Sequence, residues 1–214
     1  MTLCDDISTA LQKGQAKEVK ELVQQAIDAG MPANQILDEG LMAGMNIIGG
    51  KFKRNEVFVP EVLIAARAMN AGTALLKPLF SAAGVSAKGK AVIGTVKGDL
   101  HDIGKNLVRM MIEGKGIEVV DLGVDVSADA FVEAAAKQQA DIVCLSALLT
   151  TTMNQMKTVI DRFVAAGVRG KVKIMVGGAP VTDAFRLSIG ADAYAPDAAS
   201  AADAALELMA GVNG

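Results

Sequence analysis

The hydrophobic rhythm of the sequence changes near its middle, and this change limits the folds open to the chain more than any other feature. From about residue 4 to residue 80, apolar residues recur at spacings of three and four, as in Val19, Leu22 and Val23, which is the spacing of amphipathic helices. Glycine and proline break this pattern at three places: Lys13-Gly14, Gly30 to Pro32, and Gly49-Gly50 to Pro60. The first half therefore predicts a bundle of four helices.

The second half alternates short apolar runs with amphipathic stretches. Because parallel strands need crossover connections, strands that alternate with helices predict an open, mostly parallel sheet covered on both faces. We expect an α/β fold, with a helical-bundle domain over residues 1–87, a linker at Ser81–Lys90, and a doubly wound, Rossmann-type domain over residues 88–214. The five expected strands are Ala91–Val96, Ile117–Leu122, Ile142–Ser146, Ile174–Val176 and Ala191–Tyr194.

Charge and composition argue against several classes of function. The 21 basic and 24 acidic residues leave a net charge of -3, which is too little positive charge for a surface that binds nucleic acid or an anionic membrane. The apolar runs are too short to span a bilayer and the N-terminal residues lack a signal-peptide pattern, so we expect a cytoplasmic protein. The two cysteines suggest no disulfide framework, and we expect Cys144 to be buried rather than reactive.

Three loops with unusual residues follow the first, third and fourth expected strands. Asp99, His101 and Gly104 follow the first strand, the run Ser146 to Thr152 follows the third, and Gly177-Gly178 follows the fourth. In open α/β sheets ligands bind beyond the carboxyl ends of the strands, which in the flavodoxin-like order is between the first and third strands. The sequence therefore predicts a ligand site at this edge.

His101 is the only histidine of the chain. A lone histidine is commonly a surface residue or a hydrogen-bonded core residue, and this alternative stays open. Beside an aspartate, however, one ring nitrogen can bind a metal while the other donates to the carboxylate. One histidine cannot hold zinc, which takes three or four protein ligands. A metal that a macrocycle already chelates needs only one axial residue, and this loop could supply it.

The other two loops also have ordinary structural interpretations. Gly177-Gly178 fits a strand-to-helix turn as well as a backbone that lets a ligand approach the sheet. The run Thr150 to Thr152 fits the N-cap of a helix as well as a set of ligand-binding hydroxyls. Neither loop decides the matter alone.

Taken together, the three loops resemble the signature of cobalamin-binding domains. The matching elements are Asp-x-His-x-x-Gly at Asp99–Gly104, Ser-x-Leu at Ser146–Leu148, and the Gly177-Gly178 pair. In the first half, Gly44-Met45 and the stretch Phe58–Met69 resemble the helical cap of methionine synthase and of methyltransferase corrinoid proteins. The resemblance covers nearly the whole chain.

The resemblance implies a cobalamin (corrinoid, cobalt) cofactor bound with its own base displaced. His101 would be the lower axial ligand of cobalt, Asp99 would accept from its other ring nitrogen, and Thr152 would extend this relay where methionine synthase carries a serine. Met42, Met45, Val59 and Leu63 are candidates for a lid over the upper face, although methionines at helical spacing are also ordinary core residues. The expected cofactor-binding residues are Gly98, Asp99, His101, Asp102, Ile103, Gly104, Ser146, Leu148, Thr150, Gly177 and Gly178, with Met45 and Val59 in the cap.

The same resemblance implies a corrinoid methyl carrier of a methylamine or O-demethylase system, without catalytic activity on its own. Its expected partners are a substrate-specific methyltransferase, a folate- or thiol-dependent methyltransferase and a reductive activase, with no nucleic acid and no membrane. Two other classes stay open: a cobalamin-dependent sensor or regulator, and the cobalamin subunit of a radical mutase. Regulators of this layout usually add a DNA-binding domain, and the chain has no basic recognition helix.

Overall fold

A computed structural model describes residues 2–83 and 88–212, which fall into two compact units. The helical unit comprises residues 2–83 together with 114–116, and the α/β unit comprises residues 88–113 and 117–212. The expected domain boundary and the middle of the expected linker fall at residues 84–87, which lie outside the described residues. The boundary and the linker therefore stay predictions.

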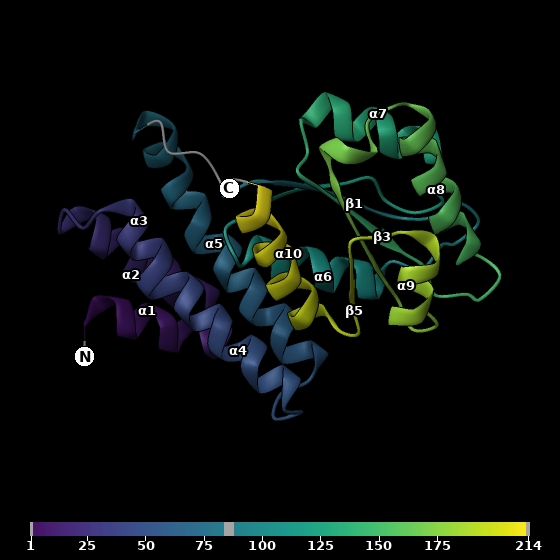
Figure 1. The fold of residues 1–214 in the computed structure, drawn as a ribbon. Coiled ribbons are helices and arrows are strands. Elements are labelled where there is room, and N and C mark those ends of the chain that lie inside the picture. The colour runs from purple at the N-terminus through teal and green to yellow at the C-terminus, as the bar shows by residue number, and fades with distance from the viewer. Residues whose placement is uncertain (1, 84–87, 213–214) are drawn as a thin grey trace. The chain divides into compact units, whose positions relative to one another are not determined.

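The helical unit contains four helical segments within residues 2–83, as the glycine and proline breaks predict. One of them is a continuous run of three elements, in which the wide turns of a π-helix join two α-helices. This run continues through Gly49 and Gly50 and ends at Lys53. The break between the third and fourth helical segments therefore begins after Lys53, and not at Gly49 as the sequence pattern predicted. The elements are α1 (Leu3–Gln12), α2 (Ala16–Asp28), α3 (Ala33–Gln35), η1 (Ile36–Met42), α4 (Ala43–Lys53) and α5 (Val59–Ala83) (Figure 1).

Small residues let the helices of this unit approach closely. A Cβ atom added to Gly44 would lie 3.0 Å from the carbonyl oxygen of Ser8, and one added to Gly72 would lie 2.8 Å from Cδ2 of Leu41. Larger side chains at these positions would push the helices apart. The interior that results is almost entirely apolar, and its fully buried side chains include Ile7, Leu11, Val19, Val23, Ile36, Leu41, Val62 and Leu76.

The α/β unit is built on a parallel sheet of five strands in the order β2-β1-β3-β4-β5. This order confirms the predicted fold class, and the strand order reverses between β1 and β3. The strands are β1 (Lys90–Thr95), β2 (Glu118–Asp121), β3 (Ile142–Ser146), β4 (Lys173–Gly177) and β5 (Ala193–Ala195). The connecting helices are α6 (Ile103–Glu113), α7 (Ala128–Gln138), α8 (Asn154–Ala165), η2 (Arg169–Lys171) and α9 (Asp183–Ile189), and α10 (Ala198–Val212) follows the last strand (Figure 1).

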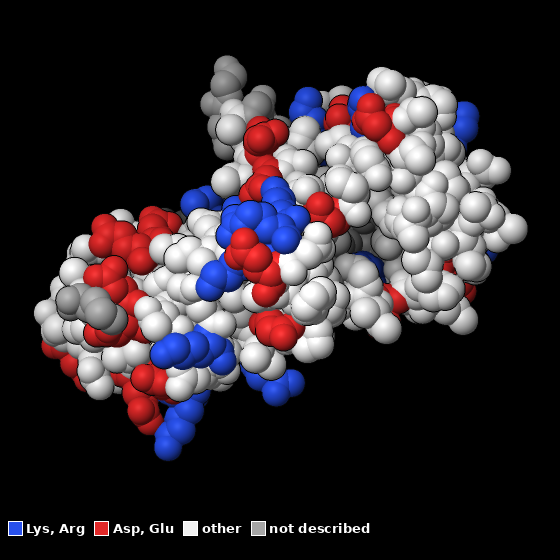
Figure 2. Space-filling view, turned by 90° about the horizontal axis from the view of Figure 1, so that it is seen from below, with Lys and Arg blue, Asp and Glu red and all other residues white. Residues whose placement is uncertain are grey.

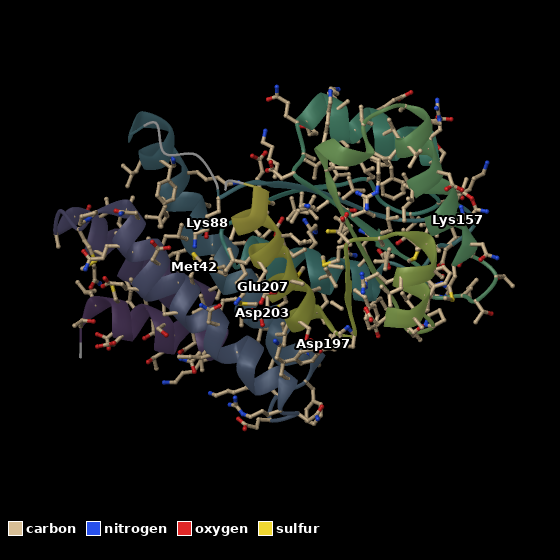
Figure 3. The ribbon with its side chains drawn as sticks, in the orientation of Figure 1. Met42, Lys88, Lys157, Asp197, Asp203 and Glu207 are labelled. Carbon is tan, nitrogen blue, oxygen red and sulfur yellow. The ribbon has the colours of Figure 1, made fainter. Side chains whose placement is uncertain are left out.

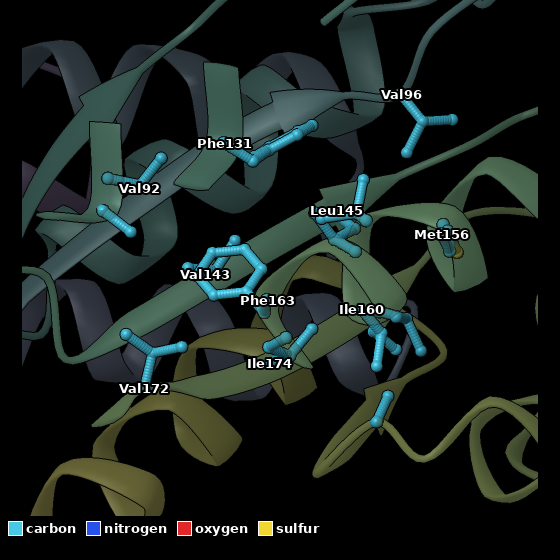
Figure 4. Packing of buried hydrophobic residues seen from close by; sticks show 14 of the residues in the cluster. Val92, Val96, Phe131, Val143, Leu145, Met156, Ile160, Phe163, Val172 and Ile174 are labelled. Carbon is cyan, nitrogen blue, oxygen red and sulfur yellow. The ribbon is translucent and has the colours of Figure 1, made fainter. Parts of the chain in front are cut away.

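Two buried aromatic rings organise the core on one face of this sheet. Phe131 of α7 and Phe163 of α8 are fully buried against strand residues such as Val143 and Ile174 (Figure 4). A Cβ atom on Gly94 would lie 2.8 Å from the ring of Phe131, so the missing side chain makes room for that ring. Because the strand residues alternate in direction, Cys144 lies on the opposite face, where its thiol is buried.

One face of the molecule carries charges of both signs. On the face drawn in Figure 2, basic and acidic side chains intermingle and neither sign dominates. Asp203 and Glu207 lie along α10, and Asp197 accepts a hydrogen bond of 2.8 Å from the backbone N–H of Ser200 at the start of this helix (Figure 3). Of the helices in the part of the chain that the structure describes, none has the length and apolar character needed to cross a membrane.

Candidate functional site

The loop that leaves β1 turns sharply before it reaches His101. Gly98 has a φ of +82°, a left-handed conformation that favours glycine. Its backbone N–H donates to Oδ1 of Asp125 at 2.7 Å, while the backbone N–H of Asp125 donates to the carbonyl of Asp99 at 3.0 Å. These two bonds tie the loop after β1 to the loop after β2.

Asp99 is completely buried and accepts five hydrogen bonds from two loops. Its Oδ1 atom accepts from the backbone N–H of His101 at 3.1 Å and lies 2.7 Å from Nδ1 of the same residue. Its Oδ2 atom accepts from the backbone N–H groups of Leu148 and Leu149, at 2.8 and 3.2 Å, and from the Thr152 hydroxyl at 2.7 Å. One carboxylate therefore joins the ends of β1 and β3 at the point where the strand order reverses.

The hydrogen bonds keep this carboxylate ionised. Burial alone would raise the pKa of Asp99, but the hydrogen bonds from Thr152, His101 and Leu148 outweigh it and hold the pKa well below its usual value. The Thr152 hydroxyl also lies 2.9 Å from the carbonyl of Leu149, but the carboxylate is the stronger acceptor. Thr152 does not cap α8, whose N-terminus has no side-chain cap.

The ionised carboxylate determines which nitrogen of His101 carries the proton. A carboxylate can only accept, so Nδ1 donates to Asp99, and in the neutral ring Nε2 is left with a free lone pair. The side chain of His101 is 50% exposed, and among the described residues none bonds to Nε2. The ring is thus fixed on one side and available to a ligand on the other.

Thr95, which the sequence did not single out, holds the backbone of this histidine. It is the last residue of β1 and is fully buried, and its hydroxyl donates to the carbonyl of His101 at 2.8 Å. A threonine at the end of a strand looks like an ordinary β-former. No sequence signal separates Thr95 from such a residue, because its partner lies in a loop of irregular backbone.

The other predicted residues of the α/β unit lie at the same edge of the sheet. Gly98, Asp102, Ile103 and Gly104 are exposed around the start of α6, and Ile103 is 76% exposed. Ser146, the last residue of β3, is half-buried, while Leu148 and Thr150 beyond that strand are exposed.

The glycine pair ends β4, since Gly177 is the last residue of that strand. Gly178 has a φ of +130°, and a Cβ atom there would lie 1.9 Å from the carbonyl oxygen of Ala147. The backbone thus comes too close at this point for any other residue.

The two predicted residues of the helical unit differ in exposure. Met45 is 2% exposed and lies in the core of that unit, whereas Val59 is half-buried at the start of α5. Of the other lid candidates, Met42 is buried and Leu63 is partly exposed. The apolar side chains that this unit exposes also include Ile47, Phe58 and Ile64. Their part in a site stays a prediction.

Comparisons with known proteins agree over both halves of the chain. A family model described as "B12 binding domain" matches residues 89–206, and a second model with the same description matches residues 3–77. The dimethylamine corrinoid protein of Methanosarcina barkeri is 43% identical over 209 residues, which cover 97% of this chain and 98% of that protein. A corrinoid protein of Desulfitobacterium hafniense (strain Y51) is 39% identical and covers 98% of both chains.

A solved structure agrees with these sequences. A chain of the methanol:cobalamin methyltransferase complex MtaBC from Methanosarcina barkeri matches with a TM-score of 0.87 and 34% identity. The match covers 98% of this chain and 80% of that chain.

Proposed function

The chain belongs to the B12 binding domain family, among the corrinoid proteins of methyltransferase systems, and we propose that it carries a methyl group between two methyltransferases. Its cofactor is a corrinoid. When bound, this cofactor supplies a cobalt ion that can accept and release a methyl group, while the protein supplies an axial ligand, the local charge and the exclusion of water.

His101 is the lower axial ligand in this proposal, and the base of the cofactor's own nucleotide is displaced. The observation that carries it is the contact of 2.7 Å between Nδ1 of His101 and the ionised Asp99. This contact leaves the lone pair of Nε2 for a metal and fixes the plane of the ring. The carboxylate of Asp99 would also hold a protonated His101 ring through a charge-assisted hydrogen bond.

The surroundings of His101 suit a large, partly apolar cofactor. Leu100 and Ile103 flank the histidine and are 71% and 76% exposed, and a Cβ atom on Gly104 would meet nothing within 4 Å. This edge of the sheet therefore offers apolar contact and open space beside one metal-binding nitrogen. The displaced tail is proposed to follow the backbone at Ser146, Leu148, Thr150, Gly177 and Gly178. Met45 and Val59 of the helical unit are proposed as residues of the lid over the upper face of the cofactor.

Dimethylamine or a related methylamine is the methyl donor that we propose. The relative named for dimethylamine covers almost the whole chain at 43% identity, and no residue favours the O-demethylase alternative. The proposed partners are a methylamine-specific methyltransferase, a second methyltransferase that uses a folate or a thiol, and a reductive activase. The pairing with a methyltransferase follows the MtaBC complex.

Reconstitution with hydroxocobalamin, followed by desalting and absorption spectroscopy, tests the ligand assignment. His101→Ala should remove the histidine-dependent band positions and lower the free energy of unfolding by about 1 to 2 kcal/mol, because the buried Asp99 loses one of its hydrogen-bond donors. Lys97→Ala, an exposed change in the same loop, is the matched control and should leave the spectrum unchanged. Identical spectra for wild type and His101→Ala would rule out the ligand role.

Methyl transfer from defined amines tests the carrier role. The reconstituted protein, reduced to the monovalent cobalt state by an added chemical reductant, is incubated with a purified dimethylamine methyltransferase and, separately, with mono-, di- and trimethylamine. We expect methylation of the protein-bound corrinoid with dimethylamine first. Transfer from none of the amines, by a methyltransferase that is active on its own carrier, would contradict the methylamine assignment.

A further inference from the structure

Lys105 is a buried cation that the proposed chemistry does not use. Its side chain is 1% exposed, and Nζ lies 2.6 Å from both carboxylate oxygens of Asp121 and 3.0 Å from Oδ1 of Asn106. Burial by itself raises the pKa of Asp121, but the hydrogen bonds from Lys105 and Gly123 and the positive charges of Lys105 and Arg109 together outweigh it, so that pKa lies below its usual value. Buried ion pairs often stabilise a fold no better than apolar residues of the same size. Stability alone therefore does not explain this pair.

The ion pair closes a ring of hydrogen bonds around the histidine loop. Asp121, the last residue of β2, accepts from the backbone N–H of Gly123 at 2.9 Å. The carbonyl of Gly123 accepts from the backbone N–H of Thr95 at 3.0 Å, and the Thr95 hydroxyl donates to the carbonyl of His101. From His101 the chain itself leads back to Lys105 in the first turn of α6.

The loop has little apolar packing of its own to hold it in place. Leu100 and Ile103, on either side of the histidine, are mostly exposed. Asp99 fixes the direction of the imidazole ring, whereas the ring of bonds through Lys105 fixes the backbone that carries it. Metal ligation by a single side chain is sensitive to both, because a ligand displaced by a fraction of an ångström loses much of its bond.

We propose that Lys105 and Asp121 are positioning residues that hold the backbone of His101 where its Nε2 can reach the metal. This inference rests on the proposed ligand role of His101. It predicts that removing the ion pair lowers histidine ligation of a bound corrinoid without unfolding the protein.

The test compares two apolar replacements in the full-length chain. Lys105→Met with Asp121→Leu removes both charges of the pair. Arg109, whose Nε lies 3.9 Å from Asp121, keeps its ion pair with Glu113 at 3.5 Å. The matched control is Arg169→Met with Asp192→Leu. Arg169 precedes β4, Asp192 precedes β5, and the two side chains form an ion pair at 2.8 Å. Like Asp121, Asp192 also accepts a hydrogen bond from a backbone N–H, that of Ile174. Lys105→Met alone serves if the double variant does not fold, because it removes the buried cation while Asp121, which is 26% exposed, can be solvated by water.

Two readouts separate position from stability. Electron paramagnetic resonance of a bound corrinoid that lacks the nucleotide base, in its divalent cobalt state, shows whether a nitrogen of the protein splits the signal, and thermal unfolding of the cofactor-free protein reports stability. The ratio of histidine-ligated to unligated corrinoid should fall about tenfold in the Lys105–Asp121 variant, while the Arg169–Asp192 control keeps the wild-type ratio.

The outcomes distinguish this inference from the function on which it rests. A full wild-type signal in the Lys105–Asp121 variant, whatever its melting temperature, would overturn the positioning role and leave His101 as the ligand. If the wild-type protein itself shows no nitrogen splitting, or keeps it in His101→Ala, the ligand assignment fails and the positioning role fails with it.

Discussion

The two units differ in what they bury. Among the described residues, the helical unit buries one polar side chain, Ser8, whereas the α/β unit buries Thr95, Asp99, Lys105 and Thr152. Burying polar groups costs free energy unless they are hydrogen-bonded. Asp99 and Thr152 are bonded to each other, Thr95 is bonded to the carbonyl of His101, and Lys105 is bonded to Asp121 at the end of β2. The interior of the helical unit is thus held together by apolar packing, whereas the interior of the α/β unit also contains the polar side chains that hold one histidine.

The largest expected effect comes from a cavity in the helical unit. Leu41→Ala removes a fully buried side chain that packs near Gly72, and should lower the free energy of unfolding by about 3 kcal/mol. The histidine-dependent spectrum of the reconstituted protein should not change. Denaturant titration and absorption spectroscopy check the two halves of this prediction. A spectrum that loses histidine ligation would show that the helical unit also positions the ligand.

A smaller effect follows from removing one buried hydroxyl in each unit. Thr152→Val leaves Oδ2 of Asp99 with one donor fewer and should lower the free energy of unfolding by about 1 to 2 kcal/mol. Ser8→Ala should lower it by less than about 0.5 kcal/mol, because Ser8 Oγ has only a long contact, 3.4 Å from Nε2 of Gln12.

The two substitutions, Thr152→Val and Ser8→Ala, should also differ in their effect on the absorption spectrum of the reconstituted protein. Thr152→Val should weaken histidine ligation, since Asp99 then holds the imidazole with a less constrained carboxylate, whereas Ser8→Ala should leave it intact. Equal effects of the two substitutions on stability and on the spectrum would remove the contrast between the units.

The smallest effect is on thiol chemistry and involves no mutation. Burial raises the pKa of Cys144 to about 12, and burial, with smaller contributions from Glu39 and Asp5, also raises the pKa of Cys4. Both thiols should therefore stay protonated at pH 8 and react slowly with iodoacetamide.

The two thiols should nevertheless differ in rate. Cys4 lies in the first turn of α1, where helix ends open most readily, so it should react before Cys144 of the central strand β3. Mass spectrometry of the peptides over time gives both rates. Faster labelling of Cys144 would mean that the sheet opens more readily than the bundle.

The sequence predicted the elements well where the pattern is local. The strand at Ile142–Ser146 was predicted to the residue, since a short run of β-branched and apolar residues identifies it. Asp99 and His101 were also singled out, because they lie two positions apart in a loop. The exact ends of β2 and β5 were not predicted, since these short strands carry weaker patterns.

What the sequence did not predict depends on pairing across the sheet. Lys105 and Asp121 are separated by 16 residues, and each looks like an ordinary surface charge until β2 lies beside β1. Gly94 gives no hint of the ring of Phe131 that occupies the space beside it. A pattern along the chain reports which face a residue takes, but not which distant side chain it meets there.

The five bonds to Asp99 also set the order in which the site can form during synthesis. Asp99 leaves the ribosome 53 residues before Thr152, so the carboxylate has no partner from the β3 loop while the first strand of the sheet is being made. The helical unit can fold from contacts that are already complete, but the histidine ring acquires its direction only after β3 has paired with β1. A translation pause between α7 and β3 would therefore yield a chain with a formed bundle and no place for the cofactor.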